Sequence, residues 1–166
     1  MQEIRIQLAR EQPQDYWEVE ALYDLCFAPG RTALSSYRLR EDVAPLPELC
    51  LTARDPEAVL AGVVRCWPVR VGGAPAVLLG PIAVHPTRQG EGIAALLMLN
   101  CIDAARLAGW TRILLVGDQP YYGRFGFTRL DGVLMPPPTN PDRVLGLPLE
   151  DGAWDGITGD VTRWSD

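Results

Sequence analysis

The sequence has little of what a metal centre requires. It contains one histidine, His85, and four cysteines, Cys26, Cys50, Cys66 and Cys101, which are widely spaced within apolar segments and form no C-x-x-C pair. A zinc site needs closely spaced thiolate and imidazole ligands. We therefore expect buried thiols, with no bound metal.

Clusters of basic residues are also absent, and the formal net charge is -6. Binding to nucleic acid depends on Lys and Arg side chains that neutralise phosphates, so the composition argues against a nucleic-acid partner. An acidic balance is compatible with a cationic acceptor such as an amine.

Long hydrophobic runs are missing as well. None reaches the roughly 18 apolar residues that a membrane span requires, and residues 1–5 lack the basic and apolar regions of a signal peptide. We expect a cytoplasmic protein that does not enter a membrane. Its 166 residues fit a single domain, 1–166. Whether it forms a homodimer is left open.

Periodicity predicts a mixed α/β chain without internal repeats. The helix expected over 92–108 is apolar almost all round, which predicts a mostly buried helix. Trp154 and Trp164 predict that the Gly- and Asp-rich segment 151–166 docks on the body. The other expected elements are strands over 3–8, 49–53, 59–67, 112–117 and 143–149, a strand after the Gly72-Gly73 turn that reaches Val84, a helix over 15–26, and a short helix or turn over 32–43.

The segment 79–94 predicts a buried strand, a tight glycine-rich turn and the first turn of a helix. A helix N-terminus presents unpaired N–H groups and partial positive charge, and Gly90 and Gly92 let a phosphate oxygen approach the backbone. The loop therefore indicates a phosphorylated cofactor. It lacks the Gly-Lys-Ser/Thr of a P-loop and the third glycine of the dinucleotide fingerprint.

Gln89-x-x-Gly92-x-Ala94 resembles the Q/R-x-x-G-x-G/A signature of the GCN5-related N-acetyltransferase (GNAT) superfamily. After the expected strand 112–117 comes Tyr121-Tyr-Gly-Arg-Phe-Gly-Phe127, which resembles the Tyr-x-x-x-Gly-Phe ending of that family. The preceding Val116-Gly117-Asp118 is similar to the YhbS-like bacterial branch. The resemblance is specific over 77–127, which would be the core that binds the cofactor.

The resemblance implies an acyl-CoA N-acyltransferase fold of the α/β (α+β) type. Its central sheet is mostly antiparallel, two middle strands splay apart, and helices flank it. Acetyl-CoA would be the co-substrate, with its pantetheine lying beside the first of these strands. Pro81 lacks an N–H group, which favours a bulge or edge there. The cofactor-binding residues so implied are Ile82, Ala83, Val84, Gln89, Gly90, Glu91, Gly92, Ile93, Ala94, Tyr122 and Phe125, although Phe125 is more typical of a core residue.

Tyr122 matches the family's general acid. A phenol with a pKa near 10 is protonated at neutral pH and can donate to a thiolate leaving group; a packing role under the cofactor is the alternative. No carboxylate stands on 78–84, so the general base is open. Glu41 is the candidate, although a solvated surface charge is the more ordinary interpretation. His85 has a suitable pKa but stands closer to the phosphate loop.

The sequence thus predicts an acetyl-CoA-dependent N-acetyltransferase. The acceptor would be an amine of a small molecule, peptide or protein that attacks the thioester directly. Two alternatives remain: transfer from a longer acyl-CoA, and a non-catalytic acyl-CoA-binding or regulatory domain. The retained Tyr122 counts against the latter.

Overall fold

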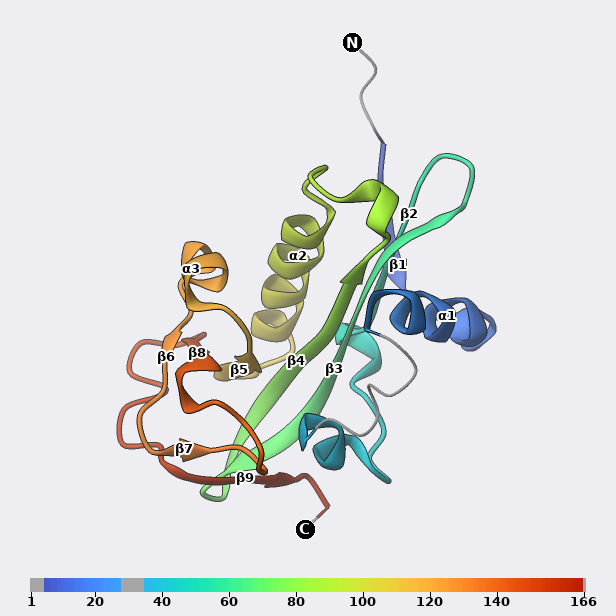
Figure 1. Cartoon of the computed structure of the whole chain (residues 1–166). Coiled ribbons are helices and arrows are strands. Elements are labelled where there is room, and N and C mark those ends of the chain that lie inside the picture. The colour runs from blue at the N-terminus through green and yellow to red at the C-terminus, as the bar shows by residue number, and fades with distance from the viewer. Residues whose placement is uncertain (1–4, 28–34, 166) are drawn as a thin grey trace.

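A twisted sheet with nine strands runs through the molecule (Figure 1). The computed structural model describes residues 5–27 and 35–165. The strands are β1 (Gln7–Arg10), β2 (Leu51–Arg54), β3 (Leu60–Val71), β4 (Ala74–Val84), β5 (Arg112–Val116), β6 (Thr128–Arg129), β7 (Val133–Leu134), β8 (Val144–Pro148) and β9 (Gly159–Arg163). The helices are α1 (Tyr16–Phe27), α2 (Ile93–Leu107) and α3 (Gln119–Tyr122), joined in places by short 3-10 turns.

The strand order is β1-β2-β3-β4-β5-β8-β6, and β9 pairs with both β3 and β7. Most pairings are antiparallel, whereas β4 runs parallel to β5 and β7 parallel to β9. This arrangement confirms the expected fold, a mostly antiparallel mixed sheet with flanking helices.

Strand β4 carries a bulge and then separates from β5. Val64 of β3 lies opposite Ile82, but Cys66 lies opposite Leu79, so β4 holds one residue more than its partner around Gly80 and Pro81. On its other edge β4 pairs with β5 only at Val77–Ile113 and Leu78–Leu114. The bulge expected at Pro81 and the splay of the two strands are both confirmed.

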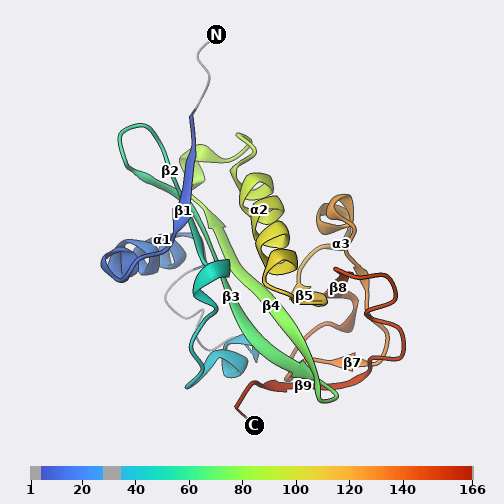
Figure 2. The same cartoon turned by 180° about the vertical axis from the view of Figure 1, so that it is seen from behind.

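Helices cover both faces of the splayed region (Figures 1 and 2). Neighbouring residues of a strand point to opposite faces. Ala83 accordingly packs in the cluster of buried residues that includes Val19 and Leu22 of α1, whereas Val84 belongs to the larger cluster around α2. The end of β4 is therefore held between the two helices.

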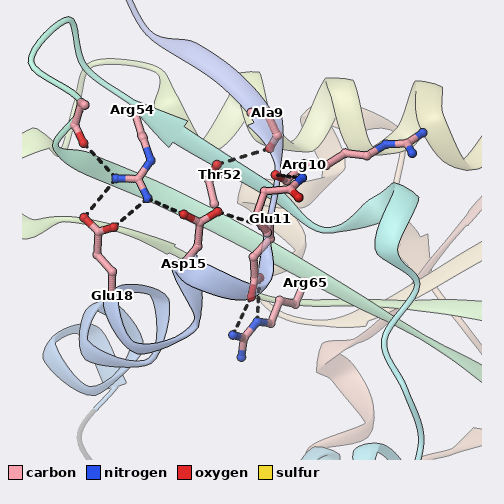
Figure 3. A network of polar contacts seen from close by, with 10 residues as sticks. Ala9, Arg10, Glu11, Asp15, Glu18, Thr52, Arg54 and Arg65 are labelled. Carbon is pink, nitrogen blue, oxygen red and sulfur yellow. Dashed lines mark hydrogen bonds and ion pairs between the residues drawn. The ribbon is translucent and has the colours of Figure 1, made fainter.

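Two arginines fasten α1 to the sheet (Figure 3). Arg54 of β2 bonds Asp15 at 3.0 Å and Glu18 at 2.6 Å, at the start of the helix. Arg65 of β3 forms two bonds of 2.9 Å with Glu11 and reaches Glu20 of α1 at 2.7 Å. These ion pairs fix where α1 lies on β3 and β4.

The expectation of a mostly buried α2 is only half right. Ile93, Leu97 and Met98 are buried, but Leu99 is 53% exposed and Leu107 is 90% exposed. The sheet covers one face of α2, and the apolar side chains on its outer face stay exposed.

Most expected strands and helices lie within a few residues of their predicted bounds. The strand over 3–8 begins only at Gln7, with residues 3–4 outside the described residues; the segment 32–43 forms a 3-10 turn at Ser35–Arg40, with residues 32–34 likewise outside. Strands β6, β7 and β9 were not predicted. Docking of the last segment is confirmed by β9 on β3 and by the Trp110–Trp164 ring contact at 5.9 Å.

Cys50, Cys66 and Cys101 are buried free thiols, as expected, and Cys66 Sγ lies 3.2 Å from Cys101 Sγ. Cys26 is a half-buried free thiol, which corrects the expectation for this one residue.

Among the described residues no helix is long and apolar enough to cross a membrane, and no cluster of three or more His, Cys, Asp or Glu side chains could hold a metal ion.

Candidate active site

The separation of β4 and β5 opens a cavity of about 330 Å³ between them, here called the central cavity. Its wall comes from both strands, at 78–82 and 115–117, and from α1, α3 and the turn Ser35–Arg40. A second space, the loop-side cavity, is lined by Val84, Gln89 and Ala94. Both share Phe27, Ile82, Tyr121 and Tyr122, so they form one groove from the glycine loop to the splay.

The glycine loop has the backbone that its sequence predicts. Gly90 and Gly92 have φ values of 84° and 80°, which side chains rarely adopt, and Gly92 is the N-cap of α2. A Cβ atom on Gly92 would meet no atom within 4 Å. Open space thus lies beside Gly92 at the start of α2, where unpaired N–H groups favour an anion.

Gln89 ties the loop to β4, because its Nε2 donates to the Val84 carbonyl at 3.0 Å. The loop's own arginine, Arg88, bonds Glu91 at 2.6 Å and Asp55 of the β2–β3 turn at 3.2 Å. The loop is therefore held from two sides before any ligand binds.

The free edge of β4 faces the groove. His85 N donates to Ala61 O, and the same register places Ala83 opposite Val63. Because peptide groups alternate between the two edges of a strand, those of Ala83 point toward β3 and those of Ile82 and Val84 point away from it. The Val84 carbonyl already accepts hydrogen bonds from Gln89 and from the Cys26 thiol. The peptide N–H and carbonyl of Ile82 are therefore the groups on this edge that a ligand could bond.

Tyr122 stands at the end of α3 and lines both cavities. Its ring contacts Tyr121 at 4.9 Å and Phe127 at 6.2 Å between centroids. Burial raises the pKa of the Tyr122 phenol, the charges of Tyr121 and Asp118 raise it further, and Arg143 opposes them. The hydroxyl therefore keeps its proton past the usual range and can serve as a donor.

Sequence reasoning assigned no role to the charged residues of the central cavity, Arg40, Asp118 and Arg143. Arg143 forms an ion pair with Asp118 across the cavity mouth. Arg40 reaches β4, where its Nη2 donates to the Gly80 carbonyl at 2.9 Å. Asp118 could have been found from its place in the motif before Tyr121, and Arg40 from its place beside Glu41, the candidate base.

Other predicted residues are not among those that line the two cavities. The Glu41 side chain is exposed and is not among the residues lining either cavity, and its carbonyl accepts from Arg163 at 3.4 Å. His85 caps a 3-10 turn through Thr87. Ile93 is a buried core residue, and Phe125 packs at the edge of the same core. Gly90, Glu91 and Gly92 are exposed in the loop.

Comparison with known proteins supplies the family. The model of the acetyltransferase (GNAT) family matches residues 14–127, which is more than half of the chain. The chain belongs to this family. The match spans α1, the splayed strands, the glycine loop and α3, and it confirms the family expected from the two motifs.

The relatives agree with this placement. YhbS from Escherichia coli K12, an uncharacterised N-acetyltransferase, is 33% identical over 119 residues, 70% of each chain. The crystal structure of E. coli YhbS with CoA has a TM-score of 0.84 at 29% identity, covering 98% of this chain and 92% of that one. A GNAT acetyltransferase from Brucella melitensis with acetyl-CoA has a TM-score of 0.72 at 27% identity, covering 95% of each.

Proposed function

We propose that this protein transfers the acetyl group of acetyl-CoA to an amine. The observation that carries the proposal is the continuous groove from the glycine loop, along the free edge of β4, to a cavity between the splayed strands. The two solved relatives with CoA or acetyl-CoA support the choice of co-substrate.

The chain's residues fit such a molecule at both ends of the groove. The N-terminus of α2, with Gly90 and Gly92 in front of it, would hold the pyrophosphate through backbone N–H groups. The peptide groups of Ile82 would bond the pantetheine arm as an added strand. The thioester would then lie beside Tyr122, at the entrance of the central cavity.

In the proposed reaction the amine nitrogen bonds to the acetyl carbonyl carbon and the carbon–sulfur bond breaks. The Tyr122 hydroxyl gives its proton to the departing thiolate, and the proton of the amine passes to solvent. Because β4 carries no carboxylate and Glu41 is exposed, the acceptor would react from its free-amine fraction. No covalent intermediate on the protein is needed.

The test combines binding and turnover. Calorimetry with acetyl-CoA should show binding at one site per chain, and release of free CoA thiol should rise when an amine panel is added. The chain contains no lysine, since all fifteen Lys and Arg residues are arginine, so lysine acetylation of the protein itself adds no background. Binding without thiol release from acetyl-, propionyl- or longer acyl-CoA would indicate a non-catalytic acyl-CoA-binding domain instead.

A further inference from the structure

Arg40 brings an unpaired positive charge into the central cavity. Its Nη2 donates to the Gly80 carbonyl at 2.9 Å, and its Nη1 makes a long contact of 3.4 Å with Ser36 Oγ. The Nε atom is buried and has no hydrogen-bond partner. Within residues 5–27 and 35–165 no carboxylate forms an ion pair with Arg40.

The guanidinium is held in place without being neutralised. Its carbon lies 4.4 Å from the centre of the Tyr37 ring and 5.2 Å from that of Trp67. Aromatic faces attract a cation, but they do not accept hydrogen bonds from the edge of the guanidinium plane. Burial lowers the pKa of Arg40 to about 10, so the side chain remains a cation at neutral pH.

The charges around Arg40 leave this cation uncompensated. Asp118 is engaged by Arg143, so the charged lining of the central cavity sums to one positive charge in a chain whose net charge is -6. On the far side of Arg40, Glu11 and Glu20 line a neighbouring cavity, but both are bonded to Arg65. A buried cation is costly unless an anion or other acceptor completes it.

The position of Arg40 indicates where such an anion would come from. Gly80 precedes Ile82 by two residues, which is at most roughly 7 Å, the length of two residues in a regular strand without the bulge. One small molecule could therefore reach both Arg40 and the proposed thioester position. We propose that the acceptor is a small amino acid, whose carboxylate accepts hydrogen bonds from Arg40 while its amine attacks the thioester. This inference rests on the proposed function.

The experiment compares acceptors that differ only in the carboxylate. Thiol release is measured for L-α-amino acids and for β- and γ-amino acids, each beside its carboxamide and its methyl ester, near neutral pH, where Arg40 is a cation. Each kcat/KM is expressed per concentration of free amine, so that differences in amine pKa do not enter the comparison. The wild type should favour at least one acid over its carboxamide by roughly tenfold or more in kcat/KM, the effect expected of a charged hydrogen bond.

Variants assign the preference to Arg40. In Arg40→Gln the ratio of acid to carboxamide should fall to near one, and Arg40→Lys should keep part of it because the charge is retained. Arg70→Gln is the matched control, since Arg70 also stacks on a tryptophan, at 4.1 Å from Trp164, but lies outside the central cavity. It should keep the full ratio.

A binding measurement separates this inference from the proposed function. N-acetyl amino acids and their carboxamides are titrated into the CoA-saturated protein, which requires no turnover. Tighter binding of an acid, lost in Arg40→Gln, supports the inference even if no amine is acetylated. Equal binding of acids and carboxamides, no binding of any acid, or a preference that survives in Arg40→Gln overturns it, whatever the transferase assay shows.

Discussion

At the scale of single residues, the groove depends on a phenol and a glycine that contribute in opposite ways. Tyr122 contributes a hydroxyl whose pKa is raised mainly by burial. Gly92 contributes the absence of a side chain: its φ of 80° disfavours other residues, and the open space at its Cβ position is left for a ligand. Substitution of Tyr122 therefore tests the chemical step, and substitution of Gly92 tests binding of the cofactor.

Replacing Tyr122 by Phe should lower kcat by roughly 100-fold while the affinity for acetyl-CoA changes little, because only the proton donor is removed. Steady-state kinetics and calorimetry measure the two effects. Tyr121→Phe removes the neighbouring hydroxyl and should have a much smaller effect on kcat. Loss of affinity with turnover intact would instead make Tyr122 a packing residue.

The raised pKa of Tyr122 also predicts the alkaline behaviour of the wild type. A general acid is active while protonated and is lost as pH rises through its pKa, so a pKa above the ordinary value of about 10 keeps the phenol in its acid form from pH 7 to about 9. The profile of kcat should show no decline in that range. A decline centred below pH 10 that disappears in Tyr122→Phe would contradict this.

Replacing Gly92 by Val should raise the dissociation constant of acetyl-CoA by roughly tenfold or more, because the branched side chain occupies the space in front of the helix N-terminus. Gly73→Val is a matched control, since Gly73 has a φ of 89° and also no neighbour within 4 Å of an added Cβ atom. Gly73→Val should impose similar backbone strain without weakening the binding of acetyl-CoA. Equal affinities of the two folded variants for acetyl-CoA would show that the glycine loop is not part of the binding site.

At the scale of elements, the site depends on α1 being held against the sheet. Tyr23 of α1 donates to the Pro81 carbonyl at 2.6 Å, and Phe27 lines the groove. Burial is the largest single effect on the pKa of Arg65 and lowers it, but the bonds to Glu11 and Glu20 and the nearby charges outweigh burial and raise it overall. The ion pairs of Arg65 thus favour its charged form, and the pair with Glu20 joins α1 to β3.

Arg65→Met should therefore lower the free energy of unfolding by about 2 kcal/mol or more, because it leaves the nearly buried Glu11 carboxylate without its partner. Denaturant unfolding measures the change. Arg106→Met, which removes an exposed pair with Asp103, should cost less than about 0.5 kcal/mol. Similar losses in both variants would show that Arg65 does not hold α1.

At the scale of the whole molecule, the groove joins segments that lie far apart in the sequence, so a ligand that fills it should stabilise the fold. Acetyl-CoA at 100 times its dissociation constant should add about 2.7 kcal/mol. For a chain of this size that is a rise in Tm of roughly 5 to 11 °C. Calorimetric scans should show this rise in the wild type and a much smaller one in Gly92→Val. An unchanged Tm in the wild type would count against binding in the groove.

The sequence by itself determined the features that depend on neighbouring residues. The glycine loop before α2, the bulge at Pro81 and the motif that begins in α3 each follow from local backbone preferences, and together they indicated the family. Local patterns also predicted most strands and helices. They were wrong about the outer face of α2, because periodicity records which residues are apolar and not whether another element covers them.

Only the tertiary structure decided which distant side chains share the central cavity. Arg40 lies 40 residues before Gly80 in the chain, and Arg143 lies 25 residues after Asp118. No local pattern relates such residues, since their contact depends on how the sheet brings the turn Ser35–Arg40 to β4 and the start of β8 to the end of β5. For the same reason Glu41, one residue after Arg40, is exposed while Arg40 reaches the cavity.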